Sequence, residues 1–172
     1  MNGTPRGSGE GGSSPSTLPR QGRLLQLELP AIGSGRPPLE RPRLLVVDDN
    51  RAHRGILLRH LRHWGLRAED APDGPAALAA LRQAATDGQP FALAILDLAM
   101  PGMDGFALAE ALRQDPALAD TRLILLTAFD AQGQAEAALR QGFAAYLTKP
   151  PRRARLLTLL QDLLDSPRSE DP

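Results

Sequence analysis

The segment LLVVDDN, residues Leu44–Asn50, places four aliphatic residues directly before two aspartates and an asparagine. A continuous apolar run of this length, half of it β-branched, is typical of a strand buried on both faces of a parallel sheet. The acidic pair lies where such a strand ends, and open α/β sheets bind ligands beyond the carboxyl ends of their strands. Asp48 and Asp49 are therefore either a ligand-binding pair or, with Asn50, the ordinary polar start of a helix.

The sequence after residue 43 repeats this alternation of an apolar strand and an amphipathic helix. Four further strands are predicted at Leu66–Glu69, where the pattern is weaker, and at Phe91–Leu96, Leu123–Leu126 and Ala144–Leu147. Five helices are predicted at Arg51–Trp64, Pro75–Ala85, Gly105–Gln114, Ala131–Gln141 and Pro151–Leu164. Helix N-caps are predicted at Asn50, Asp73, Asp104 and Asp130, and helix-ending glycines at Gly65 and Gly142.

This alternation predicts the α/β fold class. Strands that alternate with helices form βαβ units, so the sheet should be parallel and covered by helices on both faces. We expect a flavodoxin-like, doubly wound (βα)5 parallel sheet, for which the strand order is 2-1-3-4-5 if this chain follows the common five-stranded arrangement. In that order the winding reverses between strands one and three, and ligands are expected to bind at this reversal.

Residues 1–42 differ in composition from the rest of the chain. They are rich in Gly, Ser, Pro and Thr, which bury too little apolar surface to offset the entropy of ordering. We expect a disordered extension and linker there, with one stray strand at residues 23–29, where RLLQLEL alternates leucine with polar residues. The predicted organisation is this extension, a single domain at residues 43–166 and a short tail at 167–172.

The composition excludes several classes of protein. The chain has 20 Lys and Arg against 20 Asp and Glu, so no net charge attracts nucleic acid or an anionic membrane. It lacks cysteine, which excludes disulfide scaffolds and thiolate metal sites, and no apolar run reaches membrane-spanning length. We expect a soluble, cytoplasmic protein without nucleic-acid or membrane partners. The histidines among the arginines of residues 51–64 indicate a solvated basic helix face rather than a metal cluster.

Five polar residues stand at the ends of the predicted strands. Asp48, Asp49, Asp97, Thr127 and Lys149 should converge on one rim of the sheet if the order 2-1-3-4-5 holds. Three close carboxylates repel one another, and a hard cation such as Mg²⁺ relieves this repulsion. Metal, lysine and hydroxyl together supply what phosphoryl transfer requires, and Asp97, alone on the central strand, is the expected acceptor. Taken singly, each residue also fits a plainer role as a cap, a loop acid or a solvated lysine.

Four segments resemble the motifs of one known family, the receiver domain of two-component response regulators. They are VVDDN at residues 46–50, LDLAMPGMDG at 96–105, LLTA at 125–128 and YLTKP at 146–150, in the family's order. The resemblance covers residues 43–165 and implies a phosphorylation-dependent signalling switch. The partners that it implies are a sensor histidine kinase or a phosphotransfer protein, and an unknown downstream protein.

The resemblance also implies which residues accept the phosphoryl group and hold the metal ion. Asp97 would accept the phosphoryl group from a phosphohistidine. Mg²⁺ would bind through Asp48, Asp49, Asp97 and the backbone carbonyl of Ala99. The chain would then catalyse its own phosphorylation and dephosphorylation and no other reaction, so it is not expected to be an enzyme in the usual sense.

A second set of residues is implied to respond to phosphorylation. Lys149 would pair with the phosphoryl group, and Thr127 would hydrogen-bond it and move inward. Tyr146, the only tyrosine in the chain, would follow as the switch aromatic; the plainer interpretation is a ring that closes the sheet edge. The Lys149–Pro150 peptide is expected to be cis.

The sequence leaves the wider context of the domain open. We expect no output domain after the last predicted helix, and we therefore expect the chain to act through surfaces of its own. The leucines of that helix form either a wide buried face or a partner or homodimer contact. Parts of the chain look most like receivers of hybrid histidine kinases, so it is alternatively part of, or derived from, such a kinase. An aspartate-nucleophile phosphatase is the competing enzyme class, but the D-x-D-x-T pattern of that family is absent from the first strand.

Overall fold

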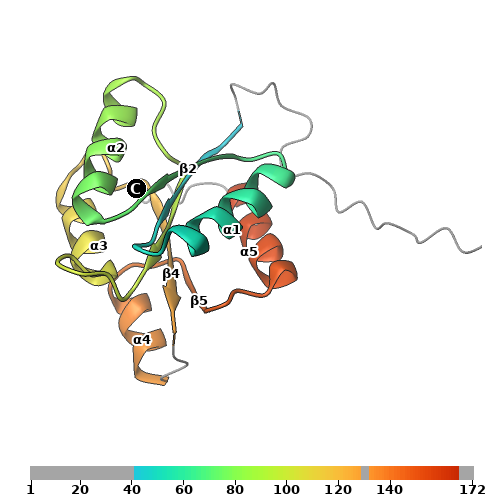
Figure 1. Cartoon of the computed structure of the whole chain (residues 1–172). Helices are drawn as coiled ribbons and strands as arrows, with labels where there is room; N and C mark the ends of the chain where they lie inside the picture. Colours follow the sequence, from blue (N-terminus) through green and yellow to red (C-terminus); the bar gives the residue numbers. More distant parts are fainter. Residues whose placement is uncertain (1–40, 129–131, 167–172) are drawn as a thin grey trace, which may run out of the picture.

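The computed structural model describes residues 41–128 and 132–166 (Figure 1). The expected extension with its stray strand, apart from Arg41 and Pro42, lies outside the described residues, as do the tail at 167–172 and the Asp130 cap. Among the described residues, no helix is both long and apolar enough to cross a bilayer.

Five strands and five helices alternate along the described chain. The strands are β1 Arg43–Val47, β2 Arg67–Ala71, β3 Leu93–Asp97, β4 Arg122–Thr127 and β5 Ala145–Thr148. The helices are α1 Arg51–His63, α2 Gly74–Thr86, α3 Gly105–Gln114, α4 Gln132–Arg140 and α5 Arg153–Asp165. All strand pairs are parallel and the sheet order is β2-β1-β3-β4-β5. The predicted doubly wound α/β fold is confirmed, with its reversal between β1 and β3.

Two apolar clusters fill the space between the sheet and its helices. Alternate residues of a strand point to opposite faces, so Leu44 and Val46 join one cluster while Leu45 and Val47 join the other. The first cluster includes the buried residues of α1 and α5, and the second includes those of α2, α3 and α4. Figure 1 shows these two groups of helices on opposite sides of the sheet. Burial on both faces explains why the strands are continuously apolar.

The predicted capping residues set several helix ends. The side chains of Asn50, Asp73 and Asp104 accept hydrogen bonds from backbone N–H groups in the first turns of α1, α2 and α3. Gly65 and Gly142 have φ angles of 81° and 79° just beyond α1 and α4, a region that glycine reaches without strain. Asn50 thus acts as the helix cap, which leaves the two preceding aspartates available for another role.

The predicted element boundaries differ from the structure by at most two residues. β3 extends through Asp97, which pairs with Leu126 of β4, so Asp97 is the last strand residue rather than the first loop residue. β4 likewise includes Thr127. α5 begins at Arg153 rather than at Pro151, because the intervening Arg152 keeps an extended backbone.

The leucine-rich face of α5 packs against the core of the domain. Leu156, Leu157 and Leu160 are buried, and Leu159, Leu163 and Leu164 are partly buried on the same cluster. The wide buried face, one of the two interpretations of these leucines, therefore accounts for all six of them.

Candidate functional site

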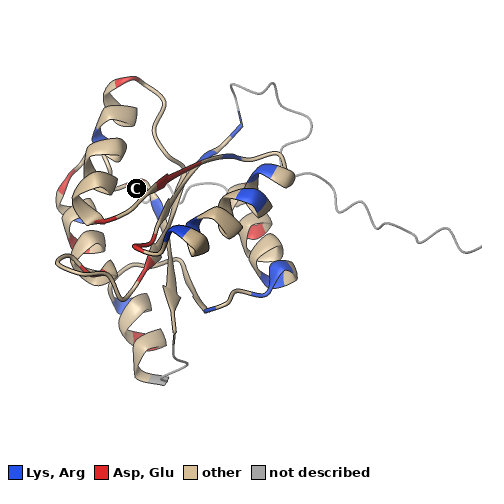
Figure 2. Ribbon diagram, viewed as in Figure 1, with Lys and Arg blue, Asp and Glu red and all other residues tan. Residues whose placement is uncertain are grey.

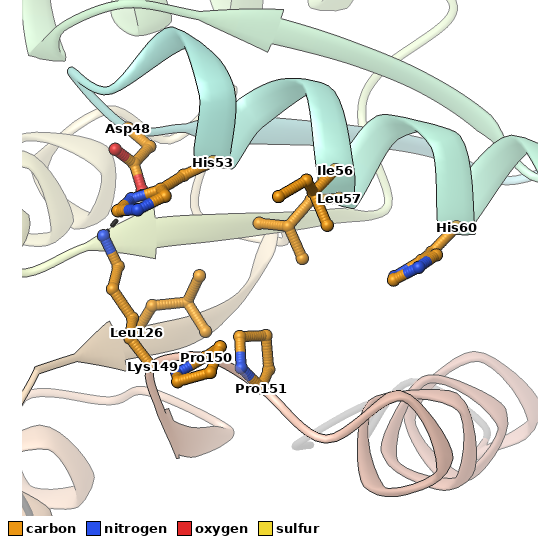
Figure 3. A pocket seen from close by; sticks show the side chains of 9 residues that line it. All are labelled: Asp48, His53, Ile56, Leu57, His60, Leu126, Lys149, Pro150 and Pro151. Carbon is orange, nitrogen blue, oxygen red and sulfur yellow. Dashed lines mark hydrogen bonds and ion pairs between the residues drawn. The ribbon is translucent and has the colours of Figure 1, made fainter.

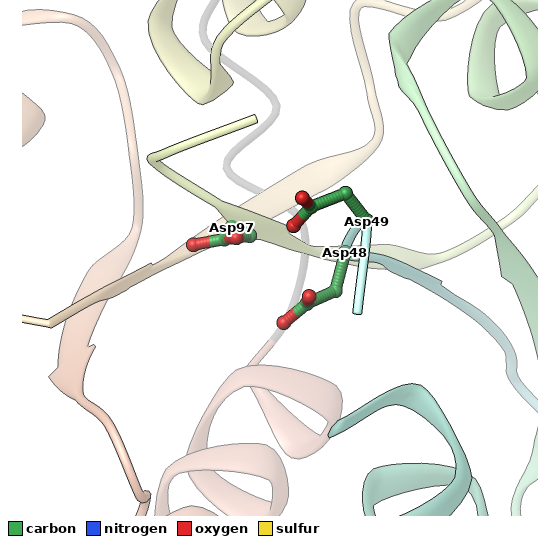
Figure 4. Close-up of side chains that lie close together, drawn as sticks. All are labelled: Asp48, Asp49 and Asp97. Atoms are coloured by element: carbon green, nitrogen blue, oxygen red, sulfur yellow. The ribbon is translucent and has the colours of Figure 1, made fainter. Parts of the chain in front are cut away.

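Three carboxylates meet at the carboxyl edge of the sheet, where the winding reverses. Asp48 and Asp49 directly follow β1, and Asp97 ends the neighbouring strand β3. One carboxylate oxygen from each residue lies within 4.8 Å of the other two (Figure 4). Asp48 and Asp97 are 0% and 4% exposed, whereas Asp49 is open to solvent. The predicted crowding of these acids is confirmed.

Lys149 brings a positive charge to this cluster from the end of β5. Its Nζ atom lies 2.6 Å from Oδ2 of Asp48 and 3.0 Å from Oδ1 of Asp97. The backbone N–H of Lys149 donates to the carbonyl of Thr127 at 2.8 Å, which fixes the lysine beside the end of β4. The Lys149–Pro150 peptide is cis, as expected.

The pKa values of Asp97 and Lys149 are both raised. Burial raises the pKa of Asp97; the hydrogen bond and charge of Lys149 act in the opposite direction, and the charge of Asp48 adds to the increase. Burial by itself lowers the pKa of Lys149, but the hydrogen bonds and charges of Asp48 and Asp97 together outweigh it. Lys149 therefore stays protonated at neutral pH, while ionised Asp97 carries a charge that burial disfavours.

Backbone contacts hold the two buried carboxylates in place. Oδ1 of Asp48 accepts a hydrogen bond from the N–H of Asn50 at 2.8 Å, and Oδ1 of Asp97 accepts one from the N–H of Ala99 at 3.3 Å. Gly105, at the start of α3, lies against the Asp97 backbone: a Cβ atom there would be 2.7 Å from the Asp97 carbonyl oxygen. The position of Asp97 therefore depends on the absence of a side chain at residue 105.

Two residues of α1 adjoin the site, although the sequence analysis assigned them to a solvated basic helix face. Nη1 of Arg54 donates to the backbone carbonyls of Asp48 and Asp49 at 2.7 and 3.3 Å, while its Nε pairs with Asp70 at 2.7 Å. Nδ1 of His53 lies 3.5 Å from Oδ2 of Asp48. The feature of the sequence that could have placed them at the site is their position in the first turn of the helix that follows the acidic pair.

Thr127 and Tyr146 lie on the two strands nearest α4. Thr127 is 3% exposed, and its hydroxyl donates a 2.7 Å hydrogen bond to Oε1 of Gln134 on α4. Tyr146 pairs with Leu125 in the β4–β5 ladder and packs, partly buried, on the cluster shared by α2, α3 and α4. The structure places both residues beside this helix, and Gln134 is a contact that sequence reasoning missed.

The acidic cluster suits a hard divalent cation. Asp48, Asp49 and Asp97 offer oxygen ligands, which Mg²⁺ prefers, and their combined negative charge exceeds the single positive charge of Lys149. Ala99, whose carbonyl is the fourth predicted ligand, is exposed two residues beyond Asp97. The three acids therefore fit a metal ion of this kind.

A pocket of about 350 Å³ opens beside the cluster, between α1 and the loop that joins β5 to α5 (Figure 3). Asp48 and Lys149 line it next to the acidic site. Its remaining lining is largely apolar and consists of Ile56, Leu57, Leu126, Pro150 and Pro151, with His53 and His60. Ile56 is half exposed, so the wall on α1 is accessible from solvent.

The sequence matches the family model for the response regulator receiver domain over residues 44–161. The matched region contains every residue of the acidic cluster and its surroundings. Among curated proteins, the chain is 34% identical over 135 residues to the response regulator PleD of Caulobacter vibrioides, a match that covers 75% of this chain and 29% of PleD. The chain therefore spans less than a third of the length of that relative.

The chain also shares its fold with solved structures of receiver proteins. The chemotaxis protein CheY4 of Vibrio cholerae is 29% identical, with a TM-score of 0.65 over 72% of this chain and 98% of CheY4. The signal receiver domain of a signal transduction histidine kinase from Syntrophus aciditrophicus is 28% identical, with a TM-score of 0.64 over 76% of this chain and 96% of that domain.

Proposed function

Because this chain belongs to the response regulator receiver family, we propose that it is a phosphorylation-dependent switch in which Asp97 accepts the phosphoryl group. Receiver domains as a class are signalling switches. The observation that carries the assignment is the setting of Asp97: its buried carboxylate lies 3.0 Å from Lys149 and within 4.8 Å of the Asp48 and Asp49 oxygens. These are the acceptor, the cation and the metal-binding acids that phosphoryl transfer needs.

The metal site is proposed to consist of Asp48, Asp49, Asp97 and the backbone carbonyl of Ala99, and Mg²⁺ is the proposed ion. The crowding of three oxygen donors supports this choice. When bound, the ion supplies positive charge that stabilises the phosphoryl oxygens during transfer. The exposure of Asp49 leaves one side of the site open to the incoming group.

In the proposed transfer, Asp97 acts as the nucleophile. Its carboxylate oxygen forms a P–O bond while the P–N bond to the donor histidine breaks, and the released imidazole nitrogen takes a proton from solvent. Lys149 is protonated at neutral pH because its pKa is raised, so it can neutralise charge on the phosphoryl group. To do so it exchanges part of its present contact with Asp97 for a phosphoryl oxygen.

Thr127 and Tyr146 are the proposed switch residues. The Thr127 hydroxyl now donates to Gln134, so it must leave that acceptor to bind a phosphoryl oxygen. Tyr146, on the adjacent strand and partly buried, would then move with the region around α4. The resulting change in surface is the signal that a downstream protein reads.

The proposed donor is a sensor histidine kinase or a phosphotransfer protein. A receiver that is part of, or derived from, a hybrid histidine kinase is the second candidate. It is favoured by the similarity to the receiver domain of the Syntrophus aciditrophicus histidine kinase. Both candidates use Asp97 in the same way and differ in the protein to which the receiver is attached.

Incubation with acetyl phosphate and Mg²⁺, followed by intact-mass measurement, tests this function. We expect one phosphoryl group per wild-type chain and none on Asp97→Asn. Asp104→Asn is a matched control because Asp104 caps α3 outside the acidic cluster, and asparagine caps equally well. Labelling of Asp97→Asn would contradict the assignment, and continuous release of phosphate without a stable adduct would favour an aspartate-nucleophile phosphatase.

A further inference from the structure

The side chain of Arg54 reaches from α1 to the backbone that carries the acidic pair. Its Nη1 atom donates a hydrogen bond of 2.7 Å to the carbonyl oxygen of Asp48 and one of 3.3 Å to that of Asp49. These two carbonyl groups belong to the peptide units on either side of the Asp49 Cα atom. Since the same nitrogen binds both, Arg54 restrains the backbone dihedral angles of Asp49 and with them the direction of its side chain.

Asp70 on β2 holds the other edge of the same guanidinium group. Nε of Arg54 donates to Oδ2 of Asp70 at 2.7 Å, and Asp70 is paired with Val46 in the β1–β2 ladder. Figure 2 shows acidic residues on β2 and basic residues along α1. The Arg54 side chain is only 12% exposed, so its guanidinium is largely shielded from solvent. We call these two side chains the Arg54–Asp70 clamp; they join α1 and β2 to the turn after β1.

Asp49 is the acid of the cluster that most needs such a restraint. The carboxylates of Asp48 and Asp97 are each bound by Lys149 and by a backbone N–H group. Within the part of the chain that the structure describes, by contrast, the Asp49 carboxylate accepts no hydrogen bond and forms no ion pair. Asp49 also lies beyond Val47, the last residue of β1 in either neighbouring ladder. The position of this carboxylate therefore depends on its backbone.

We propose that Arg54 is a positioning residue for the metal site and that it acts by fixing Asp49 as a ligand. This inference rests on the proposed function, in which Asp48, Asp49 and Asp97 hold the ion. Groups that hold metal ligands in place from behind typically contribute about 10–100-fold to metal affinity. The hydrogen bonds of Arg54 to the acidic pair go to carbonyl oxygens and not to carboxylates, so its contribution passes through the backbone.

This role requires the shape of the guanidinium group more than its charge. Arg54 uses Nη1 for the two carbonyl oxygens and Nε for Asp70, an arrangement of donors that a lysine ammonium cannot reproduce. The charge of Arg54 alone would repel a cation bound nearby, but the carboxylate of Asp70 offsets it at 2.7 Å. The clamp is therefore neutral as a pair and orients Asp49 without opposing the binding of a cation.

Metal binding without any phosphoryl donor tests the proposal directly. Mn²⁺ prefers the same oxygen ligands as Mg²⁺, and electron paramagnetic resonance measures its free concentration; competition then gives the affinity for Mg²⁺. The double variant Arg54→Gln/Asp70→Asn removes the clamp without changing the net charge. We expect its dissociation constant for either ion to be about tenfold higher than that of the wild type.

A similar ion pair at the other end of the same strands provides the control. Arg43, the first residue of β1, pairs with Glu69 of β2 at 2.7 Å, donates to the Gln89 carbonyl oxygen at 2.6 Å and is 15% exposed. Arg43→Gln/Glu69→Gln removes the same kind of contact with no change in net charge. This variant should bind Mn²⁺ and Mg²⁺ as tightly as the wild type does, even if both double variants lose similar stability.

Arg54→Lys separates the shape of the side chain from its charge. It keeps the positive charge beside Asp70 but loses the fork of donors, so it should also bind Mn²⁺ more weakly than the wild type. Circular dichroism checks that each variant is folded, and Arg54→Lys replaces the double variant if the latter is not. Wild-type affinity in Arg54→Lys, or tighter binding in Arg54→Gln, would show that charge decides and would overturn the proposal.

An Asp49→Asn background shows whether the effect passes through Asp49. Once the charge of this ligand is gone, adding Arg54→Gln/Asp70→Asn should cause little further loss of Mn²⁺ affinity. A general loosening of the domain would instead give the same loss in both backgrounds. That result would overturn the positioning role.

Labelling with acetyl phosphate separates failure of this inference from failure of the proposed function. In Arg54→Gln/Asp70→Asn, the Mg²⁺ concentration that gives half of the maximal labelling rate should rise about tenfold, and the maximal rate should fall by less. If the wild type is not labelled, the proposed function fails, and Mn²⁺ binding still decides the role of Arg54. If the wild type is labelled but the double variant binds Mn²⁺ equally tightly, the positioning role is overturned and the function stands.

Discussion

The hydroxyl of Thr127 donates a 2.7 Å hydrogen bond to Oε1 of Gln134, and this bond joins the end of β4 to α4. In the proposed switch the same hydroxyl proton goes to the phosphoryl group, so Gln134 competes with phosphorylation for it. Gln134→Ala removes this competing acceptor. We expect the variant to bind beryllofluoride, a mimic of the phosphoryl group, about fivefold more tightly, because one neutral hydrogen bond is worth about 1 kcal/mol.

A double-mutant cycle separates this competition from a general loosening of α4. In a Thr127→Ala background the Gln134→Ala change should leave beryllofluoride affinity unchanged, because the shared proton is absent from both proteins. Gln114→Ala on α3, where the side chain bonds to Glu110, is a control for the loss of a helical glutamine. An equal gain in affinity with and without the Thr127 hydroxyl would show that Gln134 acts in another way.

The ammonium of Lys149 is the positive charge that offsets two buried carboxylates, at 2.6 Å from Asp48 and 3.0 Å from Asp97. Lys149→Met leaves both acids without this partner. Removing one partner of a buried ion pair costs about 3–5 kcal/mol. We therefore expect the free energy of unfolding, measured by urea denaturation without divalent metal, to fall by about this amount. The loss of unfolding free energy should shrink when Mg²⁺ is added, since in the proposed metal site the acids would share another cation.

Arg140→Met is the matched control for that experiment. Arg140 pairs with Glu136 at 3.9 Å on the surface of α4, with both side chains about three-quarters exposed. Exposed ion pairs contribute about 0–1 kcal/mol, so the free energy of unfolding of this variant should differ from that of the wild type by no more than this. If Lys149→Met and Arg140→Met lose similar amounts of unfolding free energy, Lys149 does not stabilise the domain by neutralising the buried carboxylates.

The fold and the acidic site were predictable from the sequence because both follow from the strands. Parallel strands end at one edge of the sheet, so Asp48, Asp49 and Asp97, at the ends of two strands that are neighbours in the order 2-1-3-4-5, come together. The contacts of Arg54 and Gln134 were not predictable in this way. They depend on how a helix seats against a strand end and on the rotamer of a long side chain, which the pattern of apolar residues does not encode.

Asp97→Asn should stabilise the domain at neutral pH in the absence of metal. Because burial raises the pKa of Asp97, the folded state holds this proton to higher pH than the unfolded state does. The wild type therefore loses stability as pH rises from the ordinary aspartate pKa of about 3.9 through the raised value, and the asparagine variant does not. The variant should melt a few degrees higher at pH 7 and show little advantage near pH 4.

Magnesium provides the contrasting condition for the same pair of proteins. In the proposed metal site, Mg²⁺ would stabilise the folded wild type by mass action, and Asp97→Asn removes one of the proposed ligands. Adding the ion should therefore reduce or reverse the difference in melting temperature at pH 7. A wild type that is more stable than Asp97→Asn at pH 7 in EDTA would contradict the expected destabilisation by the buried Asp97 charge.

Gly105→Ala should disturb the acceptor through its backbone. A Cβ atom at this position would lie 2.7 Å from the carbonyl oxygen of Asp97, closer than real Cβ atoms come to a backbone atom. Overpacking typically costs about 1–3 kcal/mol, so we expect the free energy of unfolding to fall by this amount. We also expect slower labelling of Asp97 by acetyl phosphate. The substitution adds one methyl group and touches no charge, so any effect on labelling reports the position of the Asp97 backbone.

Gly55→Ala adds the same methyl group where nothing lies within 4 Å, on the exposed side of α1. Alanine is the better helix former by about 1 kcal/mol, so this variant should gain stability of that order. Its labelling by acetyl phosphate should match the wild type, because a methyl group at this site contacts no other part of the domain. In urea denaturation, the free energy of unfolding should therefore fall for Gly105→Ala and rise for Gly55→Ala. If Gly105→Ala is instead as stable and as readily labelled as Gly55→Ala, the close packing of α3 does not position Asp97.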